Sequence, residues 1–456
     1  MDKGFKKMLG IGLAAAVWAM ALAGCGGGGQ NGGADTPAAG GAGTQAAEGG
    51  GQEAGGSQGE QVTIKFIHKL PEESRMQYFN EVIAEFEKEN PNIKIEMNAY
   101  GDEEIKDKTR VLLGSDEAPD IFFTWSGQRI TQYVDSGNAL DITKYLEEDS
   151  QWKDSFNQSM LECCNKNGSY WAIPWDYDSK EMVYNKKIFA EAGITQLPAT
   201  WDELLADCQI LKDAGYTPIA LGNQYSWVVC HYITTLNGKL VPEDILNANY
   251  NMEDNAFSHE GYAKALDMVR TLYDLGYVNQ DVNSCTWEMS QAMVQEGKAA
   301  MVYEEVPNLV NYENSLGDDW GYFDFPEVEG GAGKAGYITG GPDVFMVNSE
   351  SKHPDEAIKF LKHLTSADAQ AKMVYDLGFL PVIDVELDAA QCMPEILEII
   401  EKNMKAPGIS EWLDCALNQT VADTYLIGCQ TIFDDQDGAA IMQDVSATAQ
   451  EVAEDQ

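Results

Sequence analysis

The sequence has 456 residues and is strongly acidic, with 74 Asp and Glu against 30 Lys and Arg and a formal net charge of −44. A chain of this length can bury a large core, and its 44% hydrophobic and 23% charged residues are ordinary for a globular protein. The acidity argues against binding to nucleic acid, whose phosphates need basic partners, and against electrostatic attachment to anionic lipid. It indicates a soluble, self-repelling surface, and a cationic ligand is the alternative explanation.

The first 59 residues predict export followed by a tether. Three lysines precede an apolar run over residues 8–23, which is typical of a secretory signal peptide and short for a membrane span of about 20 residues. The run ends at Cys25 in Leu-Ala-Gly-Cys, which resembles a bacterial lipobox and implies cleavage after residue 24 and lipidation of Cys25. A signal peptide cut elsewhere and a membrane helix are the alternatives. Residues 26–59 include 15 glycines, so this segment is predicted to be a flexible tether.

The folded part is predicted to begin with a β-α-β unit. Residues 61–67 and 93–97 are predicted strands, and the apolar positions between 78 and 86 mark an amphipathic helix between them. This order predicts parallel strands joined by a right-handed crossover. A further buried strand is predicted to end at Trp125.

Two more strands are predicted on either side of an acidic and aromatic stretch, Trp175–Asp178. The first runs into Pro174, and the second covers residues 182–184. Asn185 then turns the chain into a helix.

A second helix is predicted to begin after Thr200. Glu203 follows three residues later, which is the spacing of a capping box in which each side chain binds the other residue's free backbone N–H. Trp201 lies in this helix-opening motif and is expected to be structural, and Gly215 ends the helix.

The order of these motifs resembles a known family. NGSYWAIP, VYNK, PATWDEL and GYTPIA follow one another over residues 167–220, with APDIFFTW before them and GKAAM and GFLP after them. Together they resemble the carbohydrate-class solute-binding proteins of ABC importers, the broad family that includes the maltose-binding protein. The resemblance covers about residues 61–450.

The resemblance implies an α/β, two-lobed periplasmic-binding-protein-like fold of type II, with each lobe a mixed sheet flanked by helices. It implies residues 1–24 as a lipoprotein signal peptide, 25–59 as lipidated Cys and tether, 61–172 and 340–405 as the N-lobe, and 173–336 and 406–450 as the C-lobe. The lobes would be joined by hinge segments near Trp171–Pro174, Gly336–Gly341 and Ala406–Ser410.

The implied function is extracellular capture of a mono- or oligosaccharide in a cleft between the lobes, followed by delivery to a membrane permease. The expected partners are a small carbohydrate, ABC permease subunits and the membrane through the lipid on Cys25, with the protein a monomer on the extracytoplasmic face of the bacterial cell membrane. No nucleic acid, cofactor, metal or catalytic activity is expected. A sensor that reports ligand occupancy to a membrane kinase and a secreted carbohydrate-active enzyme are the alternatives.

Binding residues should combine aromatic rings for the apolar sugar faces with polar groups for the hydroxyls. Two glycines near the hinge would let backbone N–H groups approach the ligand. Each Trp could instead pack in the core, and Glu72 and Arg129 could carry surface charge or form an interlobe ion pair. Asp178 could lie on a solvated loop, and Asp343 could cap a turn. The candidate ligand-binding residues are His68, Glu72, Trp125, Arg129, Trp175, Asp178, Trp227, Glu304, Gly340, Gly341, Asp343 and Trp412.

Eight cysteines follow Cys25, and no two of them form a C-x-x-C pair. The five histidines form no H-E-x-x-H motif, so zinc is not expected. Export permits disulfides, but buried free thiols are the preferred interpretation.

Overall fold

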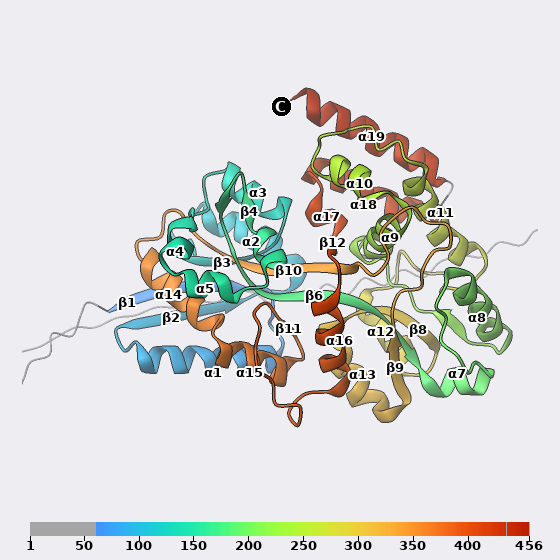
Figure 1. Ribbon diagram of the computed structural model, residues 1–456, viewed down its shortest axis with the longest axis horizontal. Helices are drawn as coiled ribbons and strands as arrows, with labels where there is room; N and C mark the ends of the chain where they lie inside the picture. The colour runs from blue at the N-terminus through green and yellow to red at the C-terminus, as the bar shows by residue number, and fades with distance from the viewer. Residues whose placement is uncertain (1–60, 435, 456) are drawn as a thin grey trace, which may run out of the picture. The chain divides into compact units, whose positions relative to one another are not determined.

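The computed structural model describes residues 61–434 and 436–455, which belong to one compact unit. The predicted signal peptide, Cys25 and the glycine-rich tether lie outside the described residues. Figure 1 shows helices packed around a central sheet in which β6 and β10 run side by side. None of the described helices combines the length and apolar character needed to cross a membrane.

The strands are β1 (Val62–His68), β2 (Ile93–Ala99), β3 (Ile121–Trp125), β4 (Asn165–Lys166), β5 (Ser169–Tyr170), β6 (Ile173–Asn185), β7 (Thr217–Ile219), β8 (Ala299–Glu305), β9 (Trp320–Phe323), β10 (Ile338–Val347), β11 (Leu380–Pro381) and β12 (Ile409–Glu411). The main sheet has the order β2-β1-β3-β10-β6-β8-β7. β11 and β9 also pair with β6, β12 pairs with β10, and β4 and β5 form a separate hairpin.

The α-helices are α1 (Glu73–Glu89), α2 (Asp102–Leu113), α3 (Gln128–Asp135), α4 (Thr143–Glu148), α5 (Ser150–Ser155), α6 (Gln158–Glu162), α7 (Lys186–Ala192), α8 (Trp201–Asp213), α9 (Trp227–Leu240), α10 (Glu243–Tyr250), α11 (Glu260–Asp274), α12 (Trp287–Gln295), α13 (Leu309–Leu316), α14 (Pro354–Leu364), α15 (Ala367–Leu377), α16 (Pro394–Lys405), α17 (Leu413–Ala416), α18 (Gln419–Thr431) and α19 (Gly438–Glu454). Two 3-10 helices, η1 (Val306–Asn308) and η2 (Gly317–Asp319), flank α13.

The predicted β-α-β start is confirmed. β1 and β2 pair in parallel along their full length, with α1 between them in sequence. β3 pairs in parallel on the other side of β1, and β10 then adds to β3 in the antiparallel direction. The sheet is therefore mixed, as predicted.

The two strands predicted on either side of Trp175–Asp178 are in fact one, and the expected break is wrong. β6 runs without interruption for 13 residues. Its first part pairs with β10, and its second part pairs with β8 and β9. Pairing with these neighbouring strands keeps the acidic stretch of β6 extended, although Asp is disfavoured in strands.

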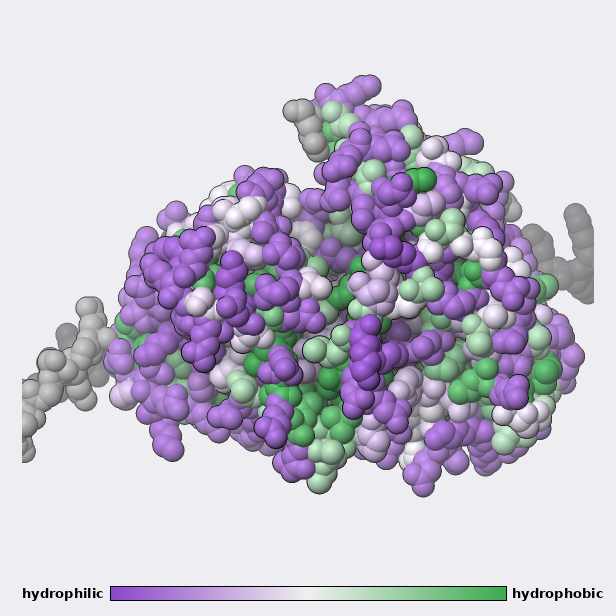
Figure 2. Space-filling model, viewed as in Figure 1, coloured by the Kyte–Doolittle hydropathy of each residue, from purple (hydrophilic) through white to green (hydrophobic). Residues whose placement is uncertain are grey.

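Two hydrophobic clusters fill the interior. The first core includes Phe66, Phe79, Trp175 and Phe345, whereas the second includes Leu236, Tyr262, Tyr303 and Tyr425. β6 contributes Trp175 to the first core and Met182 to the second, so this strand connects the two. Hydrophilic residues cover most of the face shown in Figure 2, in keeping with the acidic composition.

The predicted capping box is confirmed at the start of α8. The backbone N–H of Glu203 donates to Thr200 Oγ1 at 3.3 Å, and the backbone N–H of Thr200 donates to Glu203 Oε2 at 3.2 Å. Trp201 is buried as expected, with its ring stacked on Phe325 at a centroid distance of 6.0 Å. All eight cysteines of the described residues are free thiols.

Candidate ligand-binding site

Side chains from both cores line a cavity of about 400 Å³. This volume falls within the range of about 300–1,000 Å³ that is typical of small-molecule sites. One wall comes from the loop after β1, the start of α2 and the end of β3, so it lies where three parallel strands end at their carboxyl termini. Ligands commonly bind at that edge of an open α/β sheet.

Aromatic rings from the second lobe form the opposite wall. The Trp412 ring stacks on His231 at a centroid distance of 4.0 Å, and Trp227 lies 5.2 Å from His231. Trp287 meets Trp227 edge to face at 5.4 Å. Trp227 and His231 share one face of α9 because they are four residues apart, and Tyr225 precedes them at the cavity edge.

Trp125 provides an aromatic surface on the first wall. It ends β3, packs edge to face on Phe123 at 5.0 Å and remains partly exposed. The ammonium groups of Lys69 and Lys106 lie 5.1 and 5.3 Å from its ring centroid, within the range of cation–π contacts. The cavity thus has indole rings on both sides.

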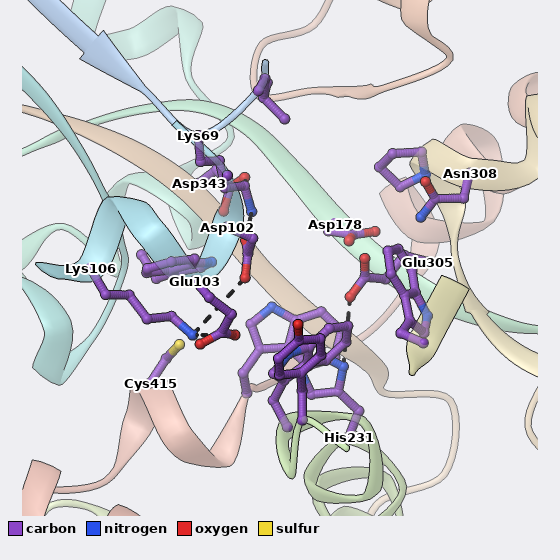
Figure 3. A pocket seen from close by; sticks show the side chains of 18 of the residues that line it. Lys69, Asp102, Glu103, Lys106, Asp178, His231, Glu305, Asn308, Asp343 and Cys415 are labelled. Carbon is purple, nitrogen blue, oxygen red and sulfur yellow. Dashed lines mark hydrogen bonds and ion pairs between the residues drawn. The ribbon is translucent and has the colours of Figure 1, made fainter. Parts of the chain in front are cut away.

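Carboxylates dominate the charged lining. The lining contains ten acidic and four basic side chains, namely Glu72, Asp102, Glu103, Glu104, Asp176, Asp178, Glu288, Glu305, Asp343 and Asp414 against Lys69, Arg75, Lys106 and Arg129. Figure 3 shows Asp178 and Glu305 directed into the same space, across the cavity from Lys69, Asp102 and Lys106.

Each basic side chain of the lining already has an acidic neighbour. Lys69 Nζ lies 2.9 Å from Asp343 and 3.6 Å from Asp102. Burial alone would lower the pKa of Lys69, but these two carboxylates raise it above its ordinary value, so the side chain stays charged. Lys106 lies 2.8 Å from Glu103.

The two arginines are paired in the same way. Arg129 donates to Asp414 at 3.4 Å and so joins α3 to α17. Arg75 lies 3.5 Å from Glu72 and also donates to Asn308 at 3.4 Å, which joins α1 to η1 of the second lobe. The Arg129–Asp414 pair matches the interlobe ion-pair alternative considered for Arg129, whereas Glu72 pairs with Arg75 only three residues later in the chain.

Several polar atoms that face the cavity have no hydrogen-bond partner among the described residues. Buried polar groups are normally paired in folded proteins, because an unmade hydrogen bond costs about 1–3 kcal/mol. A concentration of such atoms in one cavity therefore indicates a polar ligand. The unpaired atoms in the lining are Arg129 Nε, Asp176 Oδ1, Asp178 Oδ1, Trp227 Nε1, His231 Nδ1 and Trp287 Nε1.

Burial changes the protonation of these groups. It raises the pKa of Asp176 and Asp178 well above the usual range, and nearby carboxylates raise both further. Burial and the neighbouring lysines lower the pKa of His231 well below its ordinary value, so the imidazole is neutral at pH 7. Glu305 Oε1 lies 3.8 Å from His231 Nδ1, which is too far for a direct hydrogen bond.

Of the twelve candidates from the sequence, seven line this cavity: Glu72, Trp125, Arg129, Asp178, Trp227, Asp343 and Trp412. Trp227 begins α9, and Trp412 immediately precedes α17. Asp343 binds Lys69, whereas it had also been considered as a turn cap. The remaining five lie outside the lining, each for a structural reason.

His68 and Trp175 pack in the first core. His68 Nδ1 accepts from the backbone N–H of Leu70 at 3.2 Å, its ring lies 4.2 Å from that of Phe79, and burial lowers its pKa to about 3. Trp175 is 1% exposed, with Phe79 5.0 Å away on one side and Phe345 5.8 Å away on the other. Core packing, the alternative considered for each Trp, holds for Trp175.

Glu304 points away from the cavity, and its neighbour Glu305 lines it instead. Successive strand residues face opposite sides, so a shift of one position separates the two roles. Glu304 is fully buried and accepts from Gln291 at 2.9 Å, Tyr312 at 2.7 Å and Asn308 at 3.3 Å. It therefore holds Asn308, which lines the cavity, in place.

Gly340 and Gly341 also lie outside the lining, yet they shape its floor. A Cβ on Gly340 would lie 1.9 Å from the carbonyl oxygen of Asp178, so only glycine lets β10 approach β6 this closely. At Gly341 the nearest atom to such a Cβ is Trp412 Cδ1 at 3.4 Å. Gly340 thus allows close packing beside Asp178, whereas Gly341 keeps an ordinary contact distance to Trp412.

Other lining residues are not among the twelve candidates. Lys69 and Asp102 follow the ends of β1 and β2, and that position could have predicted them. His231 follows Trp227 by one helical turn, and this helical spacing could have predicted that both residues share the face of α9 that lines the cavity. Trp287 begins α12 and also lines the cavity.

Two buried glutamates predict that the protein is more stable in mild acid than above neutral pH. Burial raises the pKa of Glu181 and of Glu304 from 4.5 to about 7, and for Glu181 this outweighs the opposing effect of its ion pair with Lys402. The folded protein therefore keeps protons that the unfolded chain releases, and the resulting stability is full below pH 4.5 and lost as pH rises to 7.

One pKa unit corresponds to about 1.4 kcal/mol, so we expect thermal melts to show a melting temperature several degrees lower at pH 8 than at pH 5. Glu304→Gln should flatten this dependence, because the amide does not titrate. A melting temperature that rises between pH 5 and pH 8 would contradict the assignment.

Comparisons with known proteins place the chain in a family. The model of the family described as bacterial extracellular solute-binding protein matches residues 71–371, and the chain belongs to that family. An uncharacterized ABC transporter extracellular-binding protein of Pyrococcus horikoshii is 27% identical over 311 residues. The match covers 64% of this chain and 65% of that relative, slightly less than two thirds of its length.

Two further relatives have carbohydrate in their names. The multiple sugar-binding protein of Streptococcus mutans is 25% identical over 72% of this chain and 76% of its own. A solved structure of a chitin oligosaccharide binding protein has a TM-score of 0.77 and 22% identity, over 86% of this chain and 99% of that one. This similarity supports the two-lobed fold.

Proposed function

We propose that this protein captures a mono- or oligosaccharide in the cavity of about 400 Å³ between its two lobes. The observation that carries the proposal is the combination of indole rings on two walls with unpaired polar atoms in one buried site. The apolar faces of a sugar ring suit Trp125 and Trp412, and its hydroxyls suit Asp178, Arg129 and the indole N–H groups. The carbohydrate names of two relatives point to the same class of ligand.

The capture would serve transport. In the proposed cycle the lobes close on the sugar by a hinge motion along β6, β10 and the segment that enters β12, and the loaded protein delivers its cargo to an ABC permease. Arg75–Asn308 and Arg129–Asp414 already join the lobes across the cavity. We further propose that the protein is a monomer without catalytic activity, held at the extracytoplasmic face of the membrane by lipid on Cys25.

A thermal-shift screen tests this function. Neutral mono- and oligosaccharides, polyamines and short peptides are each added to the purified protein, and the melting temperature is recorded. A saccharide is expected to raise it, by linkage between binding and folding. If only a polyamine or a peptide stabilises the protein, the carbohydrate proposal fails. Breakdown of a bound glycan on long incubation would contradict the purely binding role.

A further inference from the structure

Asp176 and Asp178 have no ion-pair partner within 4 Å among the described residues, although Lys69, Arg75 and Lys180 act on them from farther away. All four lysines and arginines of the lining are paired with other carboxylates, as described above. Within the described part of the chain, Asp176 and Asp178 each retain a buried oxygen without a hydrogen-bond partner. Asp176 is only 2% exposed. An ionised carboxylate buried without a partner is costly, which is why burial raises the pKa of both groups. A positive group at this end of the cavity would hold them ionised.

Glu305 is a third acid at this end of the cavity. Its only basic neighbour within 4 Å among the described residues is Lys180, at 3.8 Å, apart from His231, which is neutral. Lys180 is fully buried, and its ammonium also lies 5.5 Å from the Trp227 ring centroid, beside the cavity wall. One lysine thus faces the neighbourhood of Asp178 and Glu305, and Figure 3 shows both carboxylates turned toward one space.

We propose that the bound saccharide is an amino sugar with a free ammonium group, held by Asp178 and Glu305 beside the ring of Trp227. The inference rests on the proposed function and specifies its substrate. An ammonium donates up to three hydrogen bonds and satisfies carboxylate oxygens that a hydroxyl, with one donor, satisfies only in part. The neighbouring indole adds a cation–π contact. A neutral sugar offers the carboxyl groups of Asp178 and Glu305 no positive charge.

The test uses saccharides that differ only at the charged group. Calorimetry compares three β-1,4-linked disaccharides, built of glucose, of glucosamine and of N-acetylglucosamine, together with the galactose–galactosamine and mannose–mannosamine pairs. We expect the free amine of at least one set to bind about tenfold or more tightly than its hydroxyl counterpart, as for a charge-assisted hydrogen bond. Asp178→Asn should bring that ratio close to one, and Glu305→Gln should lower it.

Glu401→Gln is the matched control. It removes the same charge from an exposed position outside the cavity lining, whose neighbour is Lys405 at 3.5 Å, where solvent and salt screen the field, so the ratio should be retained. Melting curves without ligand show whether each variant is folded. Equal or tighter binding of the neutral sugars overturns the inference and leaves the proposed function standing. Absence of binding by every amino saccharide also overturns it, and absence of binding by every saccharide overturns the proposed function as well.

Discussion

Trp125→Ala is expected to abolish most of the melting-temperature rise that a saccharide produces, while the unliganded protein stays folded. Trp125 lies at the end of β3, partly exposed and facing the cavity, so its ring is available to a ligand. Losing the apolar contact of one indole costs about 2–3 kcal/mol of binding energy, or roughly 30- to 150-fold in affinity. Thermal shift and calorimetry on the same preparation measure both effects.

Trp201→Ala is the matched control for this prediction. Trp201 is buried beside Phe325 at the start of α8, away from the cavity, and truncation of a core aromatic costs about 3–5 kcal/mol of stability. This variant should melt at a lower temperature yet keep the shift caused by the sugar. If Trp125→Ala unfolds the protein and Trp201→Ala does not, the roles given to the two residues are reversed.

Gly340→Ala is expected to destabilise the protein strongly, although it adds only one methyl group. That methyl would lie 1.9 Å from the backbone oxygen of Asp178, and no flexible side chain can move aside to make room. β10 and β6 would have to separate at the point where they form the floor of the cavity, and overpacking of this kind costs about 1–3 kcal/mol or more. Saccharide binding should weaken with it, because Asp178 is displaced.

Gly341→Ala offers the comparison one residue further along the same strand. Its added methyl would meet side-chain atoms of Trp412, Ser126 and Glu411 at 3.4–3.6 Å, which is ordinary contact. Thermal denaturation should therefore show a much smaller loss at Gly341 than at Gly340. Equal losses at the two positions would show that general glycine flexibility, and not the close approach of β6, is responsible.

Local signals in the sequence predicted much of the fold. The capping box of α8 depends on two side chains three residues apart. The β-α-β start depends on a change in the spacing of hydrophobic residues from one segment to the next. Both can therefore be recognised without knowing the tertiary structure. The break expected in β6 was wrong because its extended conformation depends on partners from distant segments, β8, β9 and β10. No local pattern reports such pairing.

The sequence predicted those site residues that can be identified from residue type and position in the chain alone. Trp125 and Trp412 follow from the resemblance, but Trp175 has the same residue type and packs in the core, because β6 directs it toward Phe79 and Phe345. Glu305 lines the cavity in place of the predicted Glu304, and which of the two does so depends on which face of β8 meets the cavity. That face is fixed by the register with β6, which the sequence does not reveal.

A fluorescence titration tests the central claim most directly, because four indoles line the cavity: Trp125, Trp227, Trp287 and Trp412. A saccharide that raises the melting temperature is added stepwise while tryptophan emission is recorded. The tryptophan emission of the native protein is expected to change until it saturates, and that of Trp125→Ala is expected to change much less. A stabilising saccharide that leaves the emission unchanged would place its binding site elsewhere and contradict the account.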